Sequence, residues 1–280
     1  MEHIDLPHEL EGFRSKLELT VKPCIEIKTH LVQGSSLIQS KFFGFPYVPK
    51  SVPYPTTPNG ENLYLLAQIN FEETPNLEDF PERGILQFYI AGDGYYGLDY
   101  EDPTNQDKFR ILYFPTPKLD ESSLVTNFDF LKTIWTYKNH FLPFWIFDSY
   151  IPCRKECFAL SFSLNSGPIL NYDYKFDELI GPEIWNILSE RGEDFWTVYT
   201  ERFGQGHRLG GNPDFCQRDP RASISREEEE YILLLQIGSD GSALEKIYIE
   251  WSDLGIGNFF IKRSDLRKLD FSKVLYNWDC

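Results

Sequence analysis

The sequence Gly44-Phe45-Pro46, followed by Leu65-Leu66-Ala67-Gln68-Ile69, has a related second copy later in the chain, and this duplication indicates how the chain folds. The second copy is Gly211-Asn212-Pro213, followed by Leu233-Leu234-Leu235-Gln236-Ile237. A third landmark follows each Gln, and three landmarks in one order at nearly constant separation indicate an internal repeat. The third landmark is Gly84-Ile85-Leu86-Gln87-Phe88-Tyr89-Ile90 in the first half and Gly255-Ile256-Gly257-Asn258-Phe259-Phe260-Ile261 in the second.

The two apolar runs, Leu63 to Ile69 and Tyr231 to Ile237, are hydrophobic on both alternating faces. This pattern favours central strands that are covered on both sides. The strands that follow them are most simply paired antiparallel through short links. The sequence therefore predicts an α+β fold of mainly antiparallel β-sheets, internally duplicated, with peripheral helices.

Helical spacing of apolar residues marks several further segments. Leu6 to Leu19 reads as an amphipathic helix packed on the body. A short helix is expected from Ser264, whose hydroxyl can cap it, through Leu269. Helices are also expected over residues 128–137, 177–190 and 193–203.

The repeat favours one compact body over two separate domains. We expect a single globular domain over residues 1–280, made of two related half-repeats at about 17–118 and 157–272. The second half-repeat carries a helical insertion at about 175–203.

The formal net charge of −16 bears on which partners the protein can bind. Such a charge repels phosphate backbones and anionic membrane surfaces, so we expect neither nucleic acid nor a membrane as a partner. It favours encounter with a basic protein, although an acidic surface also simply keeps proteins soluble.

Nothing in the sequence indicates export or insertion into a bilayer. The N-terminus lacks a signal peptide, and the apolar stretch Phe141 to Phe147 is too short to span a bilayer. We therefore expect a cytoplasmic protein whose cysteines remain thiols. They are Cys24, Cys153, Cys157, Cys216 and Cys280.

Short motifs are spread over most of the chain: Ser40-Lys41-Phe42-Phe43-Gly44-Phe45-Pro46, Leu65-Leu66-Ala67-Gln68-Ile69, Leu86-Gln87-Phe88-Tyr89, Gly210-Gly211-Asn212-Pro213-Asp214-Phe215, Gln217-Arg218-Asp219-Pro220, Leu234-Leu235-Gln236-Ile237 and Trp251-Ser252-Asp253-Leu254-Gly255. Together they resemble the bacterial YwqG-like proteins, a family with a domain of unknown function. The resemblance implies an α+β fold with an internal duplication, and it carries over no catalytic residues. Ser252 and Leu254 depart from the usual Trp-Gly-Asp-Ser-Gly form.

Familiar catalytic and cofactor motifs fail in their context. Gly92-Asp93-Gly94-Tyr95-Tyr96-Gly97 matches a dinucleotide fingerprint, but Pro103 and acids follow it instead of a helix, so we favour a glycine hairpin. The acids after it match no known calcium loop, and Cys153 and Cys157 lack further zinc ligands. No cofactor and no metal are expected.

The most reactive neighbourhood begins at His207-Arg208 and continues with Asp214, Gln217, Arg218, Asp219 and Arg221. An imidazole, guanidinium groups and carboxylates around a Gly-rich bend could bind an anion or transfer a proton. Alternatively, the Arg and Asp side chains pair with one another and with turn backbone and so hold an irregular loop.

Gln68 and Gln236 occupy corresponding places within otherwise apolar strands. Each buried amide needs hydrogen-bond partners. We expect each to hold a loop of the Gly-x-Pro region through side-chain to backbone bonds, a structural role.

A functional groove is expected at the junction of the two halves, because pockets prefer such interfaces. Our leading hypothesis is a non-enzymatic protein-interaction module, conceivably an immunity factor, whose acidic surface binds a basic protein. The alternative is a small-molecule-binding protein or hydrolase with its site at this junction. The residues expected to line the groove are His207, Arg208, Asp214, Gln236, Trp251 and Asp253.

Overall fold

The computed structural model describes residues 4–118, 120–131, 142–146, 156–190, 199–204, 206–224, 228–242 and 247–280. Ten strands form one sheet in the order β13-β12-β9-β8-β1-β7-β2-β3-β4-β5, and β10-β11-β6 form a second, three-stranded sheet. The strands are β1 (Lys22–Gln33), β2 (Lys41–Phe42), β3 (Tyr64–Asn70), β4 (Ile85–Ile90), β5 (Phe109–Phe114), β6 (Phe144–Ile146), β7 (Glu156–Gly167), β8 (His207–Gly210), β9 (Tyr231–Gly238), β10 (Asp240–Ser242), β11 (Ile247–Ile249), β12 (Ile256–Lys262) and β13 (Leu275–Asp279).

The helices of the described chain are short. They are the α-helices α1 (Arg14–Glu18), α2 (Phe176–Leu179), α3 (Glu183–Glu190), α4 (Glu201–Phe203) and α5 (Arg263–Arg267), together with the 3₁₀ helices η1 (His8–Phe13), η2 (Phe71–Glu73), η3 (Glu121–Ser123) and η5 (Pro220–Ser223).

The predicted α+β class with peripheral helices is therefore wrong. The chain is mainly antiparallel β, dominated by one curled ten-stranded sheet. The strands β3 and β4, which have a neighbour on each side, are buried along their whole length, as strands covered on both faces must be. Loops rather than helices cover the face away from the main core. Tyr47 packs there on Phe114, and Tyr54 packs on Tyr89.

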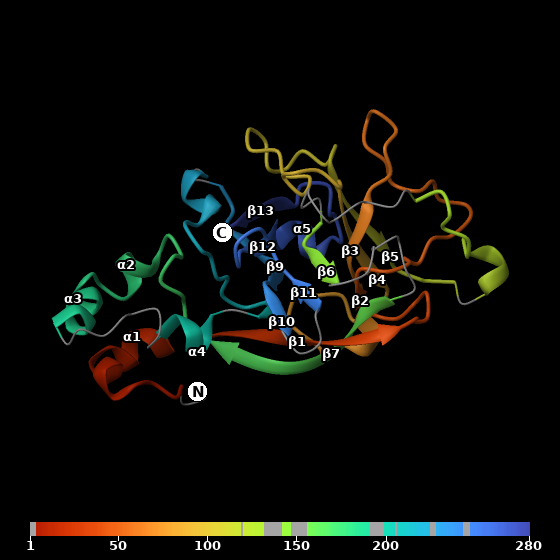
Figure 1. Ribbon diagram of the computed structural model, residues 1–280. Helices are drawn as coiled ribbons and strands as arrows, with labels where there is room; N and C mark the ends of the chain where they lie inside the picture. The colour runs from red at the N-terminus through yellow and green to blue at the C-terminus, as the bar shows by residue number, and fades with distance from the viewer. Residues whose placement is uncertain are drawn as a thin grey trace.

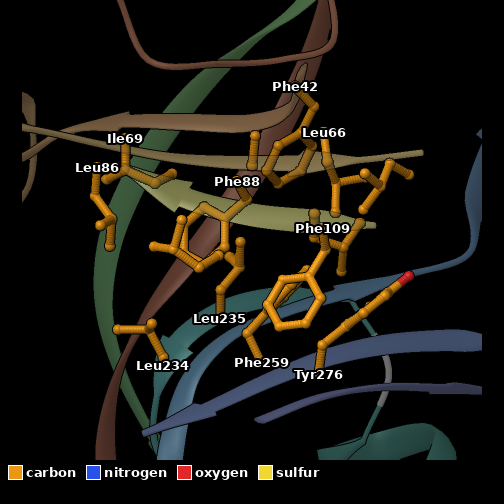
Figure 2. Packing of buried hydrophobic residues seen from close by; sticks show 14 of the residues in the cluster. Phe42, Leu66, Ile69, Leu86, Phe88, Phe109, Leu234, Leu235, Phe259 and Tyr276 are labelled. Carbon is orange, nitrogen blue, oxygen red and sulfur yellow. The ribbon is translucent and has the colours of Figure 1, made fainter. Parts of the chain in front are cut away.

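The large sheet curls until its two edges meet through the core. Phe88 of β4 lies 4.9 Å from Phe259 of β12, and Phe109 of β5 lies 5.3 Å from Tyr276 of β13, measured between ring centroids. Since β5 and β13 are the two edge strands, the rings of both ends share one core, as Figure 2 shows. Phe144 of β6 closes this core from the small sheet.

The long strands β1 and β7 interlock the two halves. β1 pairs with β7 and β8, both from the second half, while β7 pairs with β1 and β2, both from the first half. Figure 1 shows these two long strands side by side along the lower edge of the view, with β3, β4 and β5 to one side and β9, β12 and β13 to the other. Each half thus lends its first strand to the other.

A second, smaller core joins the N-terminal helices to α2 and α3 at one end of the molecule (Figure 1). Leu10, Leu17, Phe176 and Ile184 are almost fully buried in it. The helix predicted over residues 6–19 occurs as η1 and α1, and the one predicted over 177–190 occurs as α2 and α3.

The remaining helix predictions fare differently. Residues 128–131 lie in a turn, α4 occupies 201–203, and residues 132–137 and 193–198 lie outside the described chain. The capping role predicted for Ser264 is wrong. Its hydroxyl donates to Glu229 Oε2 at 2.5 Å, because α5 already begins at Arg263.

Candidate functional site

A buried polar cluster holds the loop after the first Gly-x-Pro turn. Gln68 Oε1 accepts the N–H of Tyr47 at 2.8 Å, and its Nε2 donates to the carbonyls of Leu37 and Gln39, both at 2.8 Å. Gln87, opposite Gln68 in the sheet, donates to the carbonyl of Tyr47 at 2.8 Å. Both polar groups of the Tyr47 peptide are therefore satisfied from the strands below.

A closely matching set of bonds occurs in the second half. Gln236 Oε1 accepts the N–H of Asp214 at 2.8 Å, and its Nε2 donates to the carbonyl of Gly206 at 3.1 Å. Asn258, opposite Gln236, donates to the carbonyl of Asp214 at 2.8 Å. Asp214 thus corresponds to Tyr47, and its backbone, not only its side chain, is bound into the fold.

Each cluster also contains a cation that binds loop carbonyls. Lys41 Nζ donates to Ser36 and Phe45, five residues before it and four after it, at 2.7 and 3.0 Å. Arg208 Nη1 donates to carbonyls at the same two offsets, at 3.3 and 3.4 Å, and Nη2 donates to Gly204 at 2.8 Å. Burial lowers the pKa of Lys41 to about 8. Both side chains fasten the loop that covers their strand.

His207 points into the protein. It is 3% exposed, its ring lies edge-on to Phe42 with centroids 5.2 Å apart, and its Nε2 lies 3.5 Å from Asp240 Oδ2. The neighbouring His207 imidazole is the main influence that lowers the pKa of Asp240, to which the Thr29 hydroxyl donates a hydrogen bond at 3.3 Å. The imidazole therefore lies between the main core and one half-exposed carboxylate.

Trp251 and Asp253 lie apart from these groups. Trp251 is fully buried, with its ring 5.4 Å from Tyr96, and a Cβ on Gly257 would lie only 2.3 Å from that ring. Asp253 is exposed in the turn after Trp251. Of the six residues predicted to line a groove, the structure joins Arg208, Asp214 and Gln236 in one polar cluster, places His207 beside it in β8, and leaves the other two elsewhere.

The loop after Asp214 is fastened by a buried ion-pair network. Arg221 is 4% exposed and donates to Asp173 at 2.7 Å, to Asp219 at 2.6 Å and to the carbonyl of Tyr231 at 3.1 Å. Its guanidinium also lies 4.9 Å from the ring of Phe260. Arg–Asp pairing that holds the loop was one of the two alternatives expected for this segment.

A groove of about 480 Å³ lies where the two halves meet. One wall is the segment from Leu98 to Pro103 of the first half, the other is Gln217 to Ile224 of the second, and the end of β13 lies between them. Its lining includes none of the six predicted residues.

Aromatic rings and carboxylates dominate the chemistry of this groove. Tyr100 is 66% exposed and shares the lining with the half-buried Trp278. The acidic side chains are Asp99, Glu101, Asp219 and Asp279, and the cation is Arg218.

The carboxylates of the groove differ in the hydrogen bonds and ion pairs that they already make within the protein. Asp99 accepts the N–H groups of Asp102 and Glu101 at 3.2 and 3.0 Å, and these bonds lower its pKa. Burial raises the pKa of Asp279, although its Oδ2 accepts the N–H of Gln217 at 2.7 Å. Asp219 is held by Arg221. The carboxylate of Glu101 is exposed, and it accepts no hydrogen bond from the described residues.

Sequence reasoning missed Tyr100 and Trp278, and it weighed Glu101 only as one of the acids after the glycine motif. The available signal was an exposed aromatic residue between acids in a segment with no strand pattern. Trp278 lies about 180 residues further along the chain, so only the closure of the sheet brings it near Tyr100.

Within the described residues, the Gly92–Gly97 motif forms a turn held by Asp93. Asp93 Oδ1 accepts the N–H groups of Tyr95 and Gly97 at 3.0 and 2.9 Å, and the chain then turns back towards β5 without a helix. The described residues contain no group of three or more His, Cys, Asp or Glu side chains placed to hold a metal ion. Cys153 lies outside the described residues, and Cys157 is a buried thiol.

Among the described residues, no helix has the length and apolar character needed to cross a bilayer.

Comparison with known proteins assigns the chain to a family. No curated protein matches the sequence. A family model with the description "Domain of unknown function (DUF1963)" matches residues 40–280 and so covers both Gly-x-Pro loops and both walls of the groove. The chain belongs to this family.

Proposed function

We propose that this protein is a non-enzymatic binding protein whose groove between the two halves takes a basic segment of another protein. The observation that carries the proposal is the groove itself, which combines exposed Tyr100, half-buried Trp278 and the exposed carboxylate of Glu101 in one open groove. Aromatic faces and carboxylates are the groups that bind lysine and arginine side chains.

The overall charge supports the same partner. With a net charge of −16, the molecule attracts a basic protein over several ångströms and favours its encounter. Arg218 is the opposing charge in the groove, so the partner's cations belong on the wall formed by Asp99 and Glu101.

The alternative, a hydrolase or small-molecule-binding protein that uses the loop from His207 to Arg221, has weaker support. Arg208 and Arg221 already bind carbonyl and carboxylate oxygens of the fold, and His207 faces the core. These groups are consequently not presented to a ligand, which favours the binding role.

Two finer assignments belong to the same proposal. Within the family, we infer that the chain is YwqG-like, on the motifs quoted above, and an immunity-like role would fit an acidic groove. We also place the protein in the cytoplasm, because Cys24, Cys157, Cys216 and Cys280 are free thiols.

Fluorescence anisotropy with the labelled heptapeptide Lys-Val-Lys-Val-Lys-Val-Lys tests the proposal. We expect binding that weakens with added salt and that falls about fivefold in Glu101→Lys, the effect of about 1 kcal/mol for one exposed ion pair. Glu82→Lys is the matched control, because it changes the net charge equally at an exposed position near the start of β4, away from the groove lining. Equal weakening by both variants would mean that the peptide senses only total charge, and the groove would then not be the site.

A further inference from the structure

The outer edge of β13 carries backbone groups that the sheet leaves unpaired. Tyr276 donates its N–H to the carbonyl of Pro103 at 2.9 Å, so this residue faces away from β12. Consecutive residues of an antiparallel strand alternate between facing the partner strand and facing away from it. Because β12 and β13 pair without irregularity, the N–H and C=O of Trp278 face outward as well.

These outward groups have no partner within the described chain. The carbonyl of Tyr276 and the N–H and carbonyl of Trp278 make no hydrogen bond to the described residues, whereas the indole Nε1 of Trp278 donates to the carbonyl of Tyr95 at 2.8 Å. An edge with unpaired N–H and C=O groups is a template for another strand.

On the opposite edge strand, β5, the N–H of Ile111 is already bound, because it donates to Gln106 Oε1 at 2.9 Å. The N–H and C=O of Trp278, at the end of β13, lie where that strand lines the groove.

The open edge coincides with the groove. Leu275, Asn277, Trp278 and Asp279 of β13 belong to its lining, between the wall that carries Tyr100 and Glu101 and the wall from Gln217 to Ile224. A segment lying in this groove in extended conformation therefore runs along the edge of β13, with its alternate side chains directed at the walls.

We propose that the groove binds its basic partner by strand addition, with an extended segment of the partner pairing to the outer edge of β13 beside Trp278. This inference rests on the proposed function and adds the mode of recognition. Main-chain hydrogen bonds to Trp278 supply part of the affinity, and lysine or arginine side chains at alternate positions contact Glu101 and Tyr100.

Two peptides of equal charge test the inference. One is Lys-Val-Lys-Val-Lys-Val-Lys, and the other has the same sequence with every backbone nitrogen methylated, which removes its N–H donors and keeps its lysines. Strand addition predicts at least about tenfold weaker binding of the methylated peptide, because it can no longer donate main-chain hydrogen bonds to the outward carbonyls of β13.

Amide exchange followed by NMR locates the effect on the protein. The unmethylated peptide should slow exchange at the Trp278 amide by about the same factor of ten, while the Ile111 amide, already bound by Gln106, stays unchanged as the internal control. Equal affinity for both peptides, with Glu101→Lys still weakening each, would overturn strand addition and leave the acidic groove standing. Binding of neither peptide would overturn both proposals.

Discussion

At the scale of single residues, the buried amides of Gln68 and Gln236 make hydrogen bonds to the covering loop that an apolar side chain cannot make. Each accepts the N–H two residues after the central residue of a Gly-x-Pro turn and donates to a carbonyl of the same covering segment. The sheet is thereby joined to the loop that covers it, and the polar backbone of that loop is satisfied without helix or strand.

Replacing either amide by leucine should destabilise the protein. In Gln68→Leu, the N–H of Tyr47 and the carbonyls of Leu37 and Gln39 lose their partner inside the protein, so we expect a loss of about 1–3 kcal/mol or more in unfolding free energy. Gln236→Leu should lose a comparable amount. Urea denaturation measures both, with Gln33→Leu at the exposed end of β1 as the control. A Gln68→Leu protein as stable as its parent would contradict this role.

Lys41 should make stability depend on alkaline pH. Burial holds its folded-state pKa at about 8, below the ordinary 10.5, so between these values the unfolded chain binds more protons and stability rises with pH. The parent should gain about 1 kcal/mol per pH unit in this window relative to Lys41→Met. Because tyrosines and cysteines titrate in the same range, the effect of Lys41 is measured as the difference in unfolding free energy between the parent and Lys41→Met at each pH. Lys28→Met, which removes an exposed lysine of β1, is the control. The difference in unfolding free energy between the parent and this variant should not grow with pH in the same window.

The sequence predicts some of these side-chain contacts and contains no signal for the others. A glutamine inside an apolar strand implies partners in a nearby loop, and the structure gives those partners for Gln68. His207 and Arg208 fit both a reactive pair and supports of the fold, because the sequence does not show whether their side chains point into the protein or towards solvent. Glu101 and Trp278 meet only through the closure of the sheet, which leaves no local signal.

At the scale of elements, the predicted α+β class was wrong because the helices predicted at residues 6–19 and 177–190 are short and do not pack on the large sheet. The strand runs buried on both faces still require cover. Those helices instead pack with one another in the second core, and irregular loops cover β3 and β4. Hydrophobic pattern indicates that a strand is covered and not what covers it.

The seam between the edge strands depends on Gln106. Its Oε1 accepts the N–H of Ile111 in β5, and its Nε2 donates to the carbonyl of Phe271, which precedes β13, at 2.7 Å. Gln106→Ala should cost about 1–3 kcal/mol and speed amide exchange at Ile111 by about tenfold or more. Gln106→Glu keeps the acceptor and loses the donor, so protection at Ile111 should persist. Fast exchange in both variants would assign the effect to general loosening of the seam.

At the scale of the whole molecule, the two halves share their structural parts. β1 has both its partners in the second half, β7 has both its partners in the first, and rings from both halves fill one core. The matching bonds of Gln68 and Gln236, and of Lys41 and Arg208, lie at corresponding positions on the two sides of the β1–β7 pair. We infer a duplicated unit whose copies exchanged their first strands and so became one folding domain.

That inference predicts that the two halves unfold together. Neither half can open without unpairing β1 from β7, so Gln68→Leu in the first half and Gln236→Leu in the second should each reduce amide protection at Phe88 of β4 and Phe259 of β12 to a similar extent. Calorimetry should show one transition for the sheet, with calorimetric and van't Hoff enthalpies in agreement. If Gln68→Leu exposed Phe88 while Phe259 kept its protection, the halves would be separate cooperative units, and the exchange of β1 and β7 would not bind them into one domain.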